Sequence, residues 1–151
     1  MTEQTQIDIP DAFAVPGALK QRAKALIGPA LLAVAADGDI AESERRKLGQ
    51  LMTTHPLFVR IGSTVATECV DRVMAEIASG GAERVIDRVA DLHPDLRETA
   101  LAIGLFVSAS DGAVCDAEHE VLAKLAMRLH VTPDRYNAIA DAITVLYRAS
   151  A

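Results

Sequence analysis

The sequence has no tryptophan and only three phenylalanines and two tyrosines among its 151 residues. Half of the residues are nevertheless hydrophobic, so the core has to be built from small aliphatic side chains, which favours closely packed helices. Only two cysteines are present, Cys69 and Cys115, and they lie in separate segments. This number excludes a disulfide framework and a zinc ribbon, and a reducing, cytoplasmic compartment fits it.

Long hydrophobic runs are also missing. No apolar stretch reaches the roughly 18 residues that a membrane span requires, and the N-terminal residues have neither the charge nor the apolar segment of a secretory signal. We therefore expect no direct membrane insertion. Acidic residues outnumber basic ones, 21 against 15, which gives a net charge of −6. That excess argues against nucleic acid as a partner and leaves metal cations and basic protein surfaces open.

Apolar residues recur at three- and four-residue steps through most of the chain, which predicts an all-α fold, a single bundle of about seven helices. Residues 1–16 are expected to form a partly flexible arm, and residues 17–151 a single helical domain. The predicted helices cover residues 17–36, 41–53, 63–78, 82–92, 96–110 and 116–129, with a last helix that begins at Pro133.

Several polar residues are assigned structural or exposed positions. In the second predicted helix, Arg45, Arg46 and Lys47 are expected to face outward, and the run from Glu44 to Lys47 is expected to form a solvated face. Histidines are expected at three helix ends, where an imidazole caps free carbonyl groups or meets the negative end of the helix dipole. These histidines are His55, His93 and His130.

A comparison of the sequence with itself reveals a repeat, because a shift of 74 positions aligns residues 31–44 with residues 105–118. Each copy consists of an apolar helix, an Asp-Gly turn, one apolar residue and a second helix that carries a glutamate. Glycine supports the turn because it can adopt a positive φ. If the two helix pairs pack about a pseudo-twofold axis, four carboxylates converge. They belong to Asp37, Glu44, Asp111 and Glu118.

Four carboxylates in one place repel one another unless they are protonated or bridged by a cation. A divalent metal ion would resolve this conflict, and oxygen ligands suit Mg²⁺, Ca²⁺ or Mn²⁺, although Zn²⁺ also accepts carboxylates. The pattern does not select among these ions. Asp-Gly is also a common turn pair, so the alternative is a metal-free helical protein-interaction module in which both turns are only structural.

The two blocks AADGDIAESERRKL and SASDGAVCDAEHEVL resemble the TerB-like tellurite-resistance family, whose members are small helical proteins built from a duplicated helix pair. The resemblance extends from about Leu19 to Tyr147. It implies a role in bacterial stress responses to tellurite and other insults. It also implies that the aspartate of each Asp-Gly turn and the glutamate seven residues later bind metal, which again selects Asp37, Glu44, Asp111 and Glu118.

The same resemblance implies a cellular setting. TerB-like proteins act alongside a membrane protein resembling TerC and partners resembling TerD, which would bring a cytoplasmic protein to the inner face of the membrane. The oligomeric state is left open. Related domains also occur as modules of other proteins, so the fold alone does not fix tellurite as the signal.

Other kinds of site find less support in the sequence. Cys115 and His119 could supply softer ligands for Zn²⁺, but the first repeat has no counterpart to them. A ferritin-like di-iron site needs two carboxylate-x-x-histidine elements, and only Asp116-x-x-His119 is present. No nucleophile or phosphate-binding loop motif occurs, and a metal hydrolase would need an open coordination position that the sequence does not specify. We therefore expect no enzymatic activity.

Overall fold

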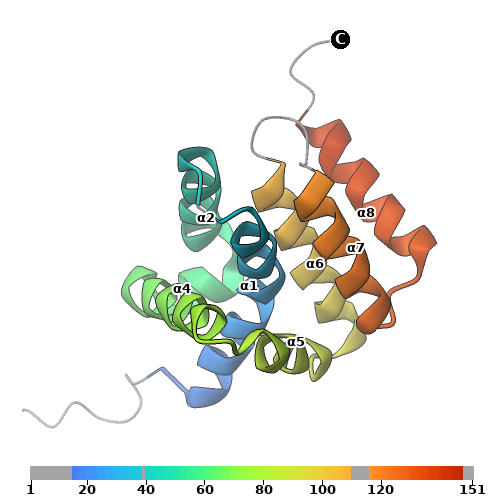
Figure 1. Cartoon of the computed structure of the whole chain (residues 1–151). Coiled ribbons are helices and arrows are strands. Elements are labelled where there is room, and N and C mark those ends of the chain that lie inside the picture. The colour runs from blue at the N-terminus through green and yellow to red at the C-terminus, as the bar shows by residue number, and fades with distance from the viewer. Residues whose placement is uncertain (1–14, 39, 110–115, 148–151) are drawn as a thin grey trace, which may run out of the picture.

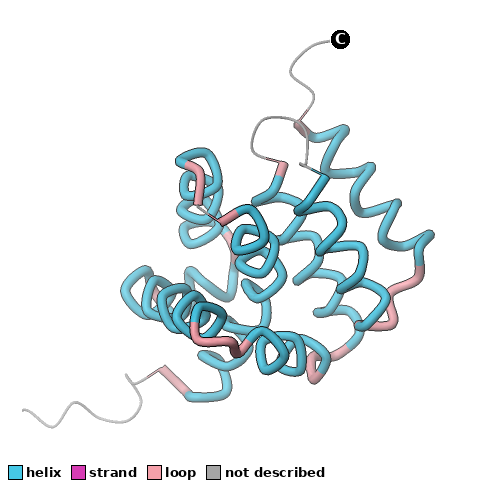
Figure 2. The backbone as a smooth tube through the Cα atoms, in the orientation of Figure 1, coloured by secondary structure: helices cyan, strands magenta, loops and turns pink. Residues whose placement is uncertain are grey.

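A computed structural model describes residues 15–38, 40–109 and 116–147. All regular secondary structure in these residues is helical, which confirms the predicted all-α class (Figure 2). The helices are α1 (Gly17–Asp37), α2 (Glu42–Thr54), α3 (Pro56–Ile61), α4 (Ser63–Ala78), α5 (Ala82–Ala90), α6 (Pro94–Ser108), α7 (Asp116–Arg128) and α8 (Pro133–Leu146).

The first helix lies in the middle of the bundle (Figure 1). Helices α4, α5, α6 and α7 all pack against α1, with α4 on the opposite side from α6 and α7. Helix α2 contacts α3, α4 and α6, and α8 lies on the outside against α6 and α7. None of the helices in the described ranges is long and apolar enough to cross a lipid bilayer.

The described residues form eight helices, one more than the roughly seven expected, since α3 follows α2 directly. Its N-cap is His55, whose Nδ1 accepts a hydrogen bond from the backbone N–H of Leu57 at 3.2 Å. Pro56 occupies the first helical position, where its missing N–H costs nothing. His55-Pro56 therefore ends α2 and also begins α3, and this short helix buries Phe58 completely.

The other two histidines also lie at helix ends, as predicted. His93 caps the start of α6 through its Nδ1, which accepts from the N–H of Asp95 at 3.3 Å. His130 follows α7 with a positive φ of 58°. The expectation that these imidazoles would serve helix C-termini is wrong for His55 and His93, because each ring nitrogen binds an amide of the following helix. A neutral ring nitrogen is an acceptor and can satisfy one of the unpaired N–H groups there.

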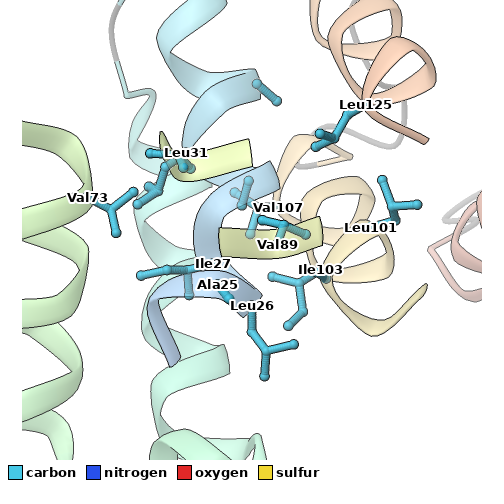
Figure 3. Close-up of a cluster of buried hydrophobic side chains, with 14 of the residues drawn as sticks. Ala25, Leu26, Ile27, Leu31, Val73, Val89, Leu101, Ile103, Val107 and Leu125 are labelled. Carbon is cyan, nitrogen blue, oxygen red and sulfur yellow. The ribbon is translucent and has the colours of Figure 1, made fainter. Parts of the chain in front are cut away.

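The core gathers around α1 and is almost entirely aliphatic (Figure 3). Ile27 and Leu31 of α1 are fully buried, together with side chains from α4, α5, α6 and α7. Two glycines allow the neighbouring helices to approach closely. A Cβ added at Gly28 would lie 3.1 Å from side chains of α5, and one added at Gly104 of α6 would lie 3.3 Å from the ring of Pro29. Because the helices approach closely, the core is filled without large aromatic side chains.

The two proposed repeats share one clear structural property. Helix α2 spans 42–54 and α7 spans 116–128, so both their starts and their ends differ by 74 positions. This is the same offset that aligns the two sequence blocks. The duplication of the whole helix pair and the pseudo-twofold axis remain predictions, since the second turn falls in residues 110–115, outside the described part of the chain.

Candidate metal centre

Three of the four predicted acidic residues lie close together, and each belongs to a different helix. Asp37 is the last residue of α1, Glu44 is the third residue of α2, and Glu118 is the third residue of α7. Gly38 follows α1 with a φ of 93°, a value that favours glycine and lets the chain turn away from the helix axis. Both glutamates lie in the first turn of a helix, where the helix dipole stabilises a negative charge.

The three carboxylates lie close enough together to share one ion. Each offers an oxygen atom, and these three oxygens lie within 4.8 Å of one another. Glu44 and Glu118 are only 5% and 3% exposed, whereas Asp37 is open to solvent. The group of Asp37, Glu44 and Glu118, called the acidic triad below, therefore has two buried members and one exposed side through which an ion could enter.

Burial and the close approach of the three carboxylates perturb the ionisation of Glu118. The pKa of Glu118 is raised to about 7, first by burial and then by the negative charges of Glu44 and Asp37. A hydrogen bond between the side chains of Glu118 and Glu44 raises it further. At neutral pH the two buried carboxyl groups thus hold a proton for part of the time, because two ionised carboxylates at this distance repel each other.

Ser108, the last residue of α6, is a neighbour of this site that sequence analysis did not identify. Its buried hydroxyl stabilises the ionised form of Glu118, which partly offsets the rise in the pKa of that carboxyl. The corresponding position in the first repeat, 74 residues earlier, is Val34. A comparison of the two repeats therefore carries no sign of a polar group at this position.

The prediction of a solvated face from Glu44 to Lys47 is wrong at two of its four positions, because Glu44 is buried and so is Lys47. The side chain of Lys47 is only 9% exposed, while Arg45 and Arg46 are exposed as expected. The Nζ of Lys47 donates to the carbonyl oxygen of Ala109 at 3.2 Å and lies 3.8 Å from the ring centre of Tyr147. Lys47 follows Glu44 by three residues, so both side chains emerge on the same face of α2.

The fourth predicted ligand, Asp111, lies outside the described residues, as does Cys115. The role of Asp111 as a metal ligand stays a prediction. His119, the other candidate for a softer ligand, does not join the acidic triad. Its Nδ1 instead lies 3.1 Å from the hydroxyl of Tyr136, which connects α7 to α8.

A comparison with models of protein families identifies the family of this chain. The family model described as "Tellurite resistance protein TerB" matches residues 23–141, well over half of the sequence. The chain belongs to the TerB family. No match was found among curated proteins or among solved structures.

The TerB match has a direct bearing on the candidate site. It covers all three members of the acidic triad and extends through Asp111. It also confirms the family expected from the two acidic blocks of the sequence. In this TerB-family chain, the acidic triad combines oxygen donors from α1, α2 and α7, a set that fits a hard divalent cation.

Proposed function

We propose that this TerB-family protein binds a divalent cation at the acidic triad and acts without enzymatic activity in a tellurite-resistance type of stress response. The observation that carries the proposal is the convergence of two buried carboxylates and one exposed carboxylate within 4.8 Å. Burying two glutamates beside each other is costly unless a proton or a cation compensates. A bound cation would offset this cost with its own charge.

The ligands would be Asp37, Glu44 and Glu118, with Asp111 completing the set from the second Asp-Gly turn. All of these donors are carboxylate oxygens, which favours Ca²⁺, Mg²⁺ or Mn²⁺ over softer ions, and Zn²⁺ is retained as a fourth candidate. In this protein the metal would supply charge neutralisation and would connect α1 and α2 to α7.

The proposed setting includes protein partners. On the resemblance to the TerB-like family, these are a TerC-like membrane protein and TerD-like proteins, and the chain would work in the cytoplasm at the inner face of the membrane. The net charge of −6 favours protein or cation partners over nucleic acid. A pull-down with a TerC-like protein, in the presence of metal and after chelation, tests this part of the proposal separately.

Metal binding is tested by titrating the metal-stripped protein with Ca²⁺, Mg²⁺, Mn²⁺ and Zn²⁺ by calorimetry, with thermal unfolding in parallel. At a free metal concentration of 100 times the Kd, the ion should add about 2.7 kcal/mol to the stability and raise Tm by roughly 5 to 10 °C. Asp37→Asn should weaken binding, and Asp37→Asn/Asp111→Asn should abolish it.

The matched control is Asp91→Asn, because Asp91 is also an exposed aspartate at the end of a helix and lies outside the acidic triad. It should bind metal like the wild type. If Asp37→Asn/Asp111→Asn also binds metal like the wild type, the acidic residues are not the site.

The second candidate is a metal-free interaction module, which is favoured by apolar side chains exposed on the outer helices. Val145 and Leu146, at the end of α8, are 57% and 69% exposed, and Met127 of α7 is 72% exposed. Under this interpretation, Leu146→Ser would abolish partner capture and Asp37→Asn would leave it intact. The reverse result would favour the metal-dependent function.

A further inference from the structure

A second polar site lies at the opposite end of α1 from the acidic triad. A cavity of about 240 Å³ opens between α1 and α4. Lys20 and Lys24 of α1 line one wall, and Arg72 of α4 lines the other. Lys20 precedes Asp37 by 17 residues, which places the two about 25 Å apart along the helix axis. The cavity is therefore independent of the candidate metal site.

Positive charge dominates this cavity in a protein that is acidic overall. Among the described residues, three basic side chains and one acidic one, Glu68, line it, which leaves a net charge of +2 from these residues at neutral pH. No ion pair joins Lys20, Lys24 or Arg72 to another residue in the described ranges. By contrast, Arg128 binds Glu83 through two hydrogen bonds of 2.7 and 3.0 Å.

The buried thiol of Cys69 is influenced by all four of these charged side chains. Cys69 lines the cavity between the two helices, and its Sγ lies 4.0 Å from the carbonyl oxygen of Lys20. Burial raises the pKa of this thiol, while Lys24, Lys20 and Arg72 lower it and Glu68 raises it. All four charged side chains therefore act electrostatically on the same thiol, which agrees with their shared place in the cavity lining.

The arrangement of the two lysines has a cost that an anion would remove. Lys20 and Lys24 are four residues apart on one helix, and like charges at this spacing destabilise a helix. The first turn of α1 has no acidic residue and its N-cap makes no side-chain hydrogen bond, so nothing in that turn offsets the positive end of the helix dipole. Gly17, the first residue of the helix, also lines the cavity.

We propose that the cavity between α1 and α4 binds a doubly charged phosphate group, held by Lys20, Lys24 and Arg72. The net charge of +2 matches a dianion, whereas a single carboxylate would leave one charge uncompensated. An arginine can donate two parallel hydrogen bonds to two phosphate oxygens, and each lysine supplies a compact ammonium donor. Glu68 opposes the anion and limits its affinity.

Nuclear magnetic resonance titration of the full chain tests this proposal. Inorganic phosphate is added at constant ionic strength, with acetate as a singly charged reference, and the backbone amide signals of residues 17–24 and 65–72 are followed. Phosphate should produce saturable shifts in both segments, and acetate should produce weak ones. Phenyl phosphate is the second probe, because it shows whether the cavity takes a phosphate monoester as well as the free ion.

Three variants give the proposal its sharpest test. Lys24→Gln should weaken phosphate binding about tenfold, since one charge-assisted hydrogen bond is lost. Glu68→Gln should strengthen binding severalfold, because it removes the opposing charge. Arg22→Gln is the matched control, since it removes a positive charge from an exposed position of the same helix that does not line the cavity. It should leave the affinity unchanged.

Two results would overturn the proposal. The first is the absence of saturable shifts up to about 10 mM phosphate, well above a millimolar Kd. The second is an equal loss of affinity in Lys24→Gln and Arg22→Gln, which would indicate diffuse attraction by the surface. Metal binding at the acidic triad does not enter this experiment, which is carried out on metal-stripped protein, so the two proposals succeed or fail separately.

Discussion

Metal binding at the acidic triad should depend steeply on pH, and the pKa of Glu118 sets the size of the effect. Because a carboxylate has to be deprotonated to bind a metal, protons compete with the ion. With a pKa of about 7, Glu118 is about 90% protonated at pH 6 and about 10% protonated at pH 8. The apparent Kd should therefore be about tenfold higher at pH 6 than at pH 8.

Calorimetry in buffers of different ionisation enthalpy measures this linkage directly. Metal binding should release about 0.9 proton at pH 6 and about 0.1 proton at pH 8. Glu118→Gln should bind metal weakly and lose the pH dependence. Glu120→Gln, a change at an exposed position two residues away on α7, should retain both properties. A wild-type Kd that is equal at pH 6 and pH 8 would refute the link between Glu118 and the metal.

The metal-free protein should show the opposite trend with pH in its stability. The folded state raises the pKa of Glu118 above its ordinary value, so between about pH 4.5 and pH 7 the folded chain binds more protons than the unfolded chain. Its stability should therefore fall as pH rises through this window, by about 1 to 3 kcal/mol. Urea unfolding at pH 5 and pH 8 measures the difference, and Glu118→Gln should be the more stable chain at pH 8.

Further predictions concern the packing around the site and around α1. Lys47→Met keeps the apolar stem but loses the contacts with Ala109 and Tyr147, so it should lower the free energy of unfolding by about 1 to 2 kcal/mol. Gly104→Ala should destabilise by about 1 kcal/mol or more in urea unfolding, because the new methyl group would lie 2.8 Å from a buried side-chain carbon. Gly49 lies in open space on α2, so Gly49→Ala should stabilise the folded protein by up to about 1 kcal/mol. Equal effects of Gly104→Ala and Gly49→Ala would refute the close packing of Gly104.

The helical periodicity of the sequence was sufficient to predict the class and most of the helices, and local capping signals account for the helix that was missed. Helix α8 was placed correctly because Thr132 and Pro133 form a familiar N-cap and N1 pair. His55 and Pro56 play the same parts at the start of α3. A six-residue helix contains fewer than two turns, too few to establish a period, so periodicity alone does not reveal α3.

The candidate site could be predicted where the repeat carries information and not elsewhere. Glu44 and Glu118 are equivalent under the 74-residue shift, and the structure brings them together with Asp37. Lys47 and Ser108 correspond to Val121 and Val34, so the comparison of the repeats could not identify them. Their burial depends on how α2, α6 and α7 meet, which is a property of the tertiary structure.

The long sequence separation between the two buried glutamates has a consequence for folding. Glu44 and Glu118 are 74 residues apart, so a cation held by both would close a loop of that length, as a disulfide does in proteins richer in cysteine. Such an ionic cross-link forms only after α2 and α7 have reached their final positions. Chelation should therefore accelerate unfolding much more than it slows refolding. An ion at this position would therefore slow the unfolding of the protein once it has folded.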